Sequence, residues 1–274
     1  MHNVLSFIEF VMQEEKQTLR MGKKKKQVPV KTKSKTTLII KAGFLIALTA
    51  GLAALISGPG TSLGLWNYQT GLTLLRLAAY GGIAATALSL IGLITSLRIV
   101  IVRGFMWALL GAVIGSSVAG LMFHWKQIAE SVPRIHDITT DTQDPPQFVS
   151  ILRLLNGDDN SHVYFGEKVA ALQQKAYPDI IPVVLPVFQD QAFEKALATA
   201  RELGWQIIDA DENAGRIEAV EMSFWFGFKD DIVIRIRQQN SGSRIDIRSV
   251  SRVGVSDLGK NAERIRKFLQ AIKE

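Results

Sequence analysis

The arginines in the last third of the chain have the type and spacing that could bind an anion. The segments DIVIRIR (231–237) and SRIDIRSVSR (243–252) place arginines at positions that share one side of a β-strand. A guanidinium presents its N–H donors as a planar fork, which matches a phosphate or carboxylate at two points. The residues predicted to bind such a group are Arg235, Arg237, Arg248 and Arg252, with Ser256 in the loop that follows.

The same arginines also have a purely structural interpretation. Arg244, Asp246, Arg216 and Glu218 fall on the same predicted face. Cross-strand pairs between arginines and carboxylates would then stabilise a solvated sheet, at about 0.2–1 kcal/mol each. The acidic segment 137–144 is a natural candidate to lie across this face, which would reduce any open binding surface.

A hydrolase is an alternative, with His136 as base and Asp137 as the group that orients it. His136, Asp137, Asp141 and Asp144 also have the composition of an acid/base or hard-metal cluster. Turn formation is the preferred explanation, because Asp and Thr before proline are ordinary turn residues. His162 stands alone in a polar loop. Ser256 lacks the GxSxG pattern of a nucleophile, and we expect it to cap a helix that begins near Asp257.

The sequence predicts no catalytic residue, cofactor or metal site with any specificity. Cysteine is absent, which excludes disulfides, thiolate catalysis and zinc sites built on sulfur. No phosphate-binding glycine motif, HExxH motif or dinucleotide-binding fingerprint occurs.

The arginines require a sheet to position them, and the sequence predicts one. Four strand signals, WQIIDA, RIEAVE, DIVIRIR and SRIDIRSVSR, follow one another with short connections. Helical periodicity precedes them at 167–176 and 190–203 and follows them from about residue 257. We therefore predict an α+β domain at 124–274, with an antiparallel sheet of about four strands and helices on one face.

Three apolar segments precede this domain, at about 37–57, 77–97 and 104–123. Each is about 20 residues long, which suffices to cross the roughly 30 Å hydrocarbon core of a bilayer. Gly111 and Gly115 form a GxxxG pattern in the third segment, which lets helices approach closely. The pattern fits packing within the chain or association of two copies.

Charge is divided unevenly along the chain. Up to Phe123 there are 13 Lys plus Arg against 3 Asp plus Glu, and from His124 onward the count is 19 against 22. The basic excess lies mainly in the tail 1–36 before the first span, so nucleic acid is not the expected partner. Lys and Arg near spans stay on the cytoplasmic side, which predicts a cytoplasmic N-terminus and a periplasmic C-terminal domain in a bacterial inner membrane. Met1 and Met21 are both candidate translation starts.

Longer motifs carry a family resemblance. IHDITTDTQDPPQF, YPDI, DDIVIRIR and above all GSRIDIRSVSRVGVSDLGKNAERI resemble domain-of-unknown-function family fourteen ninety-nine of bacteria and plastids, over about residues 135–273. The resemblance implies an extracytoplasmic or lumenal domain, often tethered by N-terminal spans, and supplies no catalytic residue.

These observations predict a membrane-anchored binding or assembly module of the cell envelope. Its expected partners are the lipid bilayer and an anionic envelope ligand or protein, with self-association possible through Gly111 and Gly115. The alternatives are the hydrolase that uses His136 and Asp137 and a purely structural membrane protein.

Overall fold

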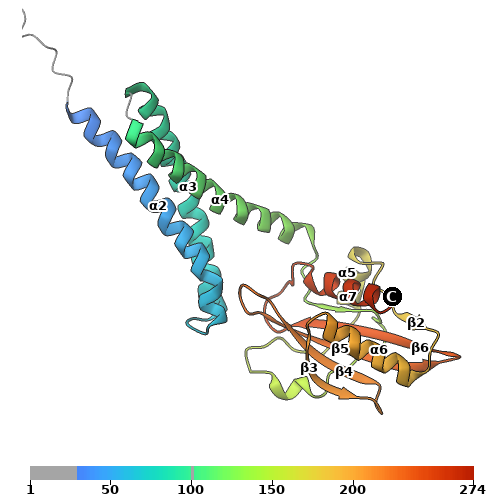
Figure 1. Cartoon of the computed structure of the whole chain (residues 1–274). Coiled ribbons are helices and arrows are strands. Elements are labelled where there is room, and N and C mark those ends of the chain that lie inside the picture. The colour runs from blue at the N-terminus through green and yellow to red at the C-terminus, as the bar shows by residue number, and fades with distance from the viewer. Residues whose placement is uncertain (1–29, 100–101) are drawn as a thin grey trace, which may run out of the picture.

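Three long helices form the N-terminal part of the chain in the computed structural model, which describes residues 30–99 and 102–274 (Figure 1). They are α2 (Val30–Ser62), α3 (Tyr68–Ile99) and α4 (Val102–Ser131). All three are long and apolar enough to cross a membrane, over Lys35–Ser62, Tyr68–Ser96 and Gly104–Ser131. The three predicted segments are thus confirmed as helices. Their length and apolar composition are those of membrane spans. Most of the basic tail, with Met1 and Met21, lies outside the described residues.

Small residues bring these three helices into close contact. A Cβ on Gly115 of α4 would lie 2.7 Å from the carbonyl oxygen of Gly82 on α3, and Gly111 is similarly close to Ser89. Gly43 of α2 also packs on Ser89. Both glycines of the GxxxG pattern therefore make contacts within the chain, and self-association through them stays a prediction.

The C-terminal part contains an antiparallel sheet in the order β1-β6-β5-β4-β3, with β2 also paired to β6. The central pair, β5 and β6, is the longest. The strands are β1 (Asp137–Thr139), β2 (Val183–Leu185), β3 (Gln206–Asp211), β4 (Arg216–Met222), β5 (Lys229–Gln239) and β6 (Gly242–Ser251).

The expectation of four strands was wrong, because the sheet has six. The four predicted strands correspond to β3 to β6. The two that were missed, β1 and β2, have three residues each, which is too short for an alternating pattern to be recognised. Both pair with β6, each along a different part of it, so β6 has three partners, β1, β2 and β5.

One face of the sheet is covered by helices, as predicted. Isoleucines of β4, β5 and β6 pack there against α6 (Gln189–Glu202) and α7 (Lys260–Ala271) in a continuous apolar core. Residue 169 of α5 (Glu167–Ala176) packs against the same core. This core fixes which residues of β5 and β6 point to the opposite face, where the arginines lie.

The opposite face is covered as well, by the segment 140–165 with its short 3-10 helix η1 (Ile151–Leu154). Phe148 and Ile151 of this segment form a second, smaller apolar cluster with Val233 and Val250 of the sheet. The buried Glu218 carboxylate of β4 accepts N–H bonds of 2.8–3.1 Å from residues 149–151. We call residues 140–165 the covering segment.

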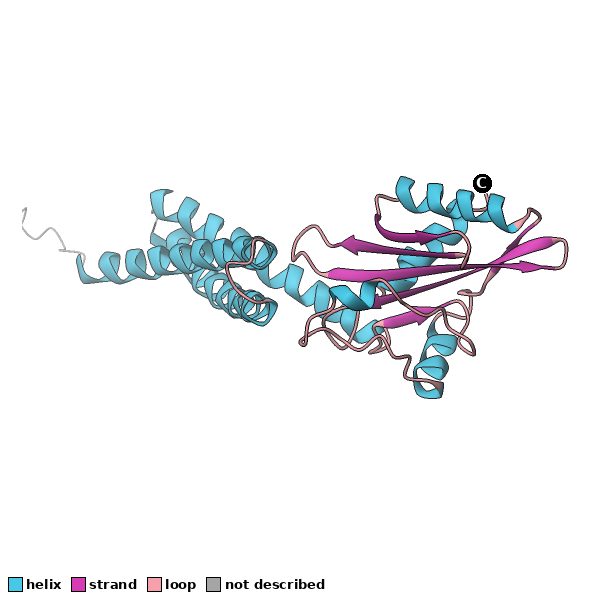
Figure 2. Cartoon of the chain, turned by 90° about the horizontal axis from the view of Figure 1, so that it is seen from below, coloured by secondary structure: helices cyan, strands magenta, loops and turns pink. Residues whose placement is uncertain are grey.

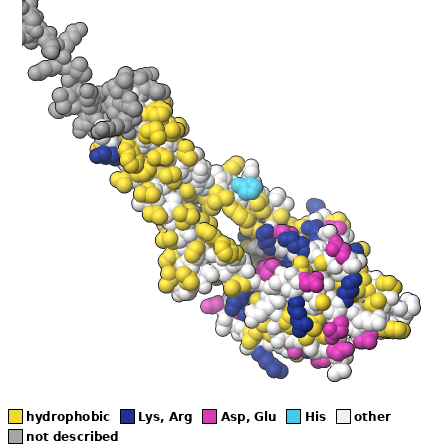
Figure 3. Space-filling view, in the orientation of Figure 1, with side chains coloured by type: hydrophobic (Ala, Val, Ile, Leu, Met, Phe, Trp, Pro, Cys, Tyr) yellow, Lys and Arg dark blue, Asp and Glu magenta, His cyan; other side chains and the backbone are white. Residues whose placement is uncertain are grey.

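The sheet has one end near the helices and one end far from them. The β5–β6 hairpin at residues 240–241 forms the far end, and the strands run away from the three helices (Figure 2). The register Asp230↔Ser251 and Asp137↔Val250 places the start of β5, the end of β6 and the start of β1 at the near end. Hydrophobic side chains dominate the helical part in Figure 3, whereas charged side chains gather on the C-terminal domain.

Candidate functional site

Arg248 lies at the centre of the predicted anion-binding face and is completely buried. Its Nε and Nη2 donate to the two carboxylate oxygens of Asp137 at 2.9 and 2.8 Å. Its remaining donors reach the carbonyl oxygens of Pro146 and His162 at 3.1 and 2.7 Å. The guanidinium group thus already has an internal anion, and its position is fixed by the covering segment.

Arg252 is arranged in the same way. It makes a two-point contact with Asp231, with Nε and Nη2 2.8–3.1 Å from the carboxylate oxygens. The Nε2 of His162 lies 2.8 Å from the same carboxylate. His162 therefore does not stand alone, as the sequence suggested, but is buried in a contact with a strand residue 69 positions away.

Arg235, Arg237 and Arg244 form a third cluster, nearer the far hairpin. Their guanidinium groups share the carboxylates of Asp141, Asp144 and Asp246 at 2.7–4.0 Å. The hydrogen bond from Arg237 is the main reason that the pKa of Asp144 lies below its usual value. The prediction that the acidic segment lies across the arginines is confirmed.

The arginines differ in their access to solvent. Arg248 and Arg252 are buried, whereas the side chain of Arg237 is 45% exposed. Binding of an external anion by Arg235, Arg237, Arg248 and Arg252 stays a prediction. Any such ligand has to compete with carboxylates that the chain itself supplies. Among these four arginines, Arg237 has the side chain that is most accessible to it.

Ser256 lies in the loop between β6 and α7, away from these clusters. Its Oγ accepts an N–H bond from Leu258 at 3.3 Å. The expectation that Ser256 caps the last helix was wrong, because α7 begins at Lys260. The residue that satisfies the N–H groups there is Asp257, which accepts from Gly259 and Asn261 at 2.8 and 2.9 Å.

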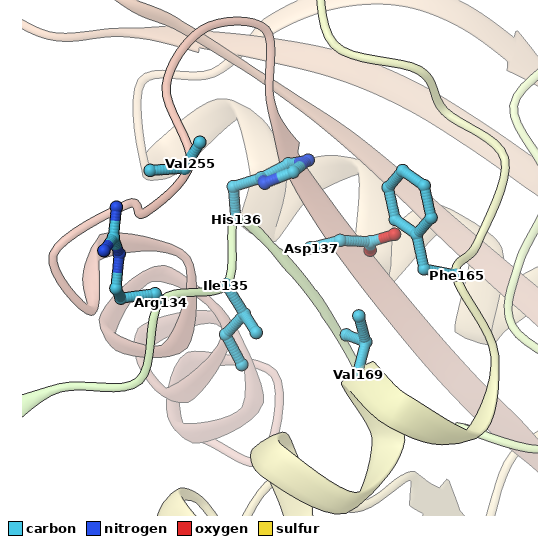
Figure 4. A pocket seen from close by; sticks show the side chains of 7 residues that line it. All are labelled: Arg134, Ile135, His136, Asp137, Phe165, Val169 and Val255. Atoms are coloured by element: carbon cyan, nitrogen blue, oxygen red, sulfur yellow. The ribbon is translucent and has the colours of Figure 1, made fainter.

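A pocket of about 240 Å³ lies at the near end of the sheet, beside the residues that follow α4 (Figure 4). Its walls are mostly apolar, with one exposed cation, and the Nε2 of His136 is buried without a hydrogen-bond partner among the described residues. Figure 4 shows Arg134 and Phe165 on opposite sides. The lining residues are Arg134, Ile135, His136, Asp137, Phe165, Val169 and Val255.

The pocket contains both residues of the proposed hydrolase, but not in the arrangement that the hydrolase needs. Both carboxylate oxygens of Asp137 are bound by Arg248, and no hydrogen bond joins Asp137 to His136 in the described part of the chain. His136 instead makes an edge contact with the Phe165 ring, whose centroid is 6.3 Å away. The orienting role of Asp137 therefore has no support in this geometry.

Sequence reasoning found His136 and Asp137 but missed the rest of the pocket. Phe165 is the last residue of the covering segment, Val169 lies in the first turn of α5, and Val255 comes from the loop after β6. These segments meet because β1 pairs with the end of β6, and a three-residue strand gives almost no pattern to detect.

Fold and site together define a chain with three apolar, membrane-type helices and a C-terminal α+β domain whose arginine-rich face is covered. Residues 137–272 match a known family, described as protein of unknown function (DUF1499). The chain belongs to this family through its C-terminal half. A comparison with curated proteins found no match.

Proposed function

We propose that the protein is a membrane-anchored binding module of the cell envelope. In this proposal the N-terminus is cytoplasmic and the C-terminal domain is periplasmic. The support is the charge distribution, since nine Lys and Arg precede the first apolar segment and residues 58–75 contain none. The test is a fusion of a reporter enzyme after Glu274. A reporter that works only outside the cytoplasm is expected to show activity. If instead only a reporter that works in the cytosol shows activity, this orientation is overturned.

The observation that carries the binding role is the pocket beside Arg134. Arg134 is exposed and has no carboxylate within ion-pair distance among the described residues, unlike the arginines of the sheet. The buried, unpartnered Nε2 of His136 is costly unless something hydrogen-bonds to it. An anionic group at the mouth of the pocket would pair with the exposed Arg134 guanidinium.

The size and walls of the pocket limit the ligand. Ligand sites commonly have volumes of about 300–1,000 Å³, so a pocket of 240 Å³ holds only part of a larger molecule. Phe165, Val169 and Val255 offer apolar contacts to that part. The arrangement supports an amphiphile with a short apolar portion in the pocket and its anionic group beside Arg134.

The test is binding of octyl phosphate to the full chain in an uncharged detergent, measured by calorimetry. Charge-assisted hydrogen bonds contribute about 1.5–3 kcal/mol, so Arg134→Gln is expected to weaken binding roughly 10- to 100-fold. Arg153→Gln is the matched control, because Arg153 is also an exposed arginine of the same domain. Inorganic phosphate is expected to bind more weakly than octyl phosphate. Equal binding by wild type and Arg134→Gln would refute the proposal.

A further inference from the structure

The loop between β4 and β5 is unusually rich in aromatic residues. Residues 222–228 read MSFWFGF, with four aromatic side chains in five positions. We call this segment the aromatic loop. It has no part in the pocket or in the arginine clusters.

The loop has a defined conformation. The backbone N–H of Ser223 donates to the carbonyl of Phe228 at 2.8 Å, and the N–H of Gly227 donates to the carbonyl of Ser223 at 3.0 Å. Gly227 has a φ of +68°, which favours glycine at the turn. The Phe226 and Phe228 rings are stacked with centroids 5.0 Å apart. The backbone of the loop and the rings of Phe226 and Phe228 are therefore held in place.

The aromatic loop packs against the ends of α2 and α3 that are nearest the domain. The Trp225 ring contacts Gly58, and a Cβ on Gly71 would lie 3.0 Å from the Phe226 ring. The Phe228 and Tyr68 rings meet edge to face, with centroids 6.1 Å apart. The loop is thus held at the level at which these two helices end.

That level corresponds to a headgroup layer if the helices cross a bilayer, as the proposed function requires. The apolar part of α2, Lys35–Ser62, has 28 residues, which is about 42 Å at 1.5 Å per residue. The hydrocarbon core is about 30 Å thick, and the bilayer with its headgroups is about 40–45 Å. Gly58 is four residues, or about 6 Å, before the end of α2 at Ser62. It therefore lies about 15 Å from the midplane, at the boundary between the hydrocarbon core and the outer headgroup layer, together with the loop that contacts it.

Part of the loop points away from the protein. Phe224 is 94% exposed and Met222 is 61% exposed, and on the neighbouring α2–α3 connection Leu63 and Leu65 are 76% and 70% exposed. Exposed apolar side chains at this level lie where aromatic residues concentrate in membrane proteins. We propose that the aromatic loop inserts into the interface of the outer leaflet, with phospholipid as its partner.

Insertion of the loop adds a second attachment to the one that α4 provides. Because α4 runs directly into the domain before β1, the domain is attached to the bilayer at both places. This orientation would hold the near end of the sheet, with the Arg134 pocket, against the membrane surface. Lipid contact of the loop does not depend on whether the pocket binds a ligand.

The absence of cysteine from the sequence allows a direct test. Phe224→Cys is labelled with an environment-sensitive fluorophore, and the full chain is reconstituted into vesicles of phosphatidylcholine and phosphatidylglycerol in a 3:1 ratio. Headgroup-proximal spin-labelled lipids are expected to quench the fluorophore at least twofold, while aqueous iodide quenches it weakly. Ser241→Cys, in the exposed far hairpin, is the matched control and is expected to show the reverse.

Iodide quenching at residue 224 equal to that at residue 241 would overturn the proposal. Circular dichroism of each labelled chain, compared with wild type, verifies that the fold is retained. A second label at Leu63→Cys reports on the same layer without altering the aromatic loop. Arg134→Gln in the labelled chain is expected to leave the lipid quenching unchanged, so failure of the pocket and failure of the loop can be distinguished.

Discussion

Replacement of Arg248 by methionine tests whether this arginine supports the fold rather than an external ligand. Methionine keeps the apolar stem but removes the partner of Asp137, which is 2% exposed. Removing one member of a buried ion pair costs about 3–5 kcal/mol, because the other charge stays buried. The carbonyl groups of Pro146 and His162 also lose their donors. We therefore expect Arg248→Met to lower the free energy of unfolding by about 4 kcal/mol.

Arg237→Met is the matched control on the same face. Its side chain is 45% exposed, and its buried partner Asp246 keeps hydrogen bonds from Arg235 and Arg244. An exposed pair of this kind contributes about 0–1 kcal/mol. The expected difference between the two variants is thus about 3 kcal/mol. At roughly 2–4 °C per kcal/mol for a domain of this size, this is about 6–12 °C in melting temperature.

The assay is thermal unfolding of the full chain in an uncharged detergent, followed by near-ultraviolet circular dichroism. The double variant Asp137→Leu/Arg248→Met is expected to recover part of the loss, because it removes both buried charges. If Arg248→Met melts within 2 °C of Arg237→Met, the reasoning about the buried pair is refuted.

Three further predictions concern other parts of the chain. Burial, with a smaller contribution from Asp137, raises the pKa of Tyr164 to about 12. The folded state therefore holds the phenol proton more tightly than the unfolded state does. The resulting stabilisation is present below about pH 10 and is lost as the pH rises toward 12. The difference in ultraviolet absorbance between wild type and Tyr164→Phe during alkaline titration is expected to have a midpoint near 12, and a midpoint near 10 would contradict this. Asp257→Ala is expected to lower the free energy of unfolding in urea by about 0.5–2 kcal/mol, because the N–H groups at the start of α7 lose their acceptor. A smaller effect than that of Ser256→Ala would contradict this. Gly115→Ile is expected to lower the aggregation temperature of the full chain, because the added side chain would separate α3 and α4. Gly120 faces open space, so Gly120→Ile is expected to leave this temperature unchanged. Equal effects of the two variants would argue against this packing.

The sequence was sufficient to predict the elements with a long, regular pattern. The alternating isoleucines of β5 and β6 indicated both the strands and the face that meets the helices, and the structure confirms this assignment. The limits of α5, Glu167–Ala176, also agree with the prediction. Strands β1 and β2 were missed because their three residues pair only where β6 offers them a partner, which is a tertiary effect.

The candidate site was less accessible to prediction. The two-residue period of a strand was enough to predict that the arginines share one face. It could not predict which carboxylates pair with them. Asp137 lies 111 positions from Arg248 in sequence, and Asp141 lies 103 positions from Arg244. Contacts at this separation depend on the path of the covering segment, which has little regular structure of its own. The pocket beside Arg134 was missed for the same reason.

The position of β6 in the chain determines when this domain can assemble. Strands β1, β2 and β5 all pair with β6, and β6 (Gly242–Ser251) is the last strand in chain order. The carboxylates of residues 137–144 are synthesised long before the arginines that neutralise them. Such non-local pairing is intrinsically slow. The sheet therefore cannot assemble until β6 has been synthesised, because β1, β2 and β5 have no other way to form their pairings with it.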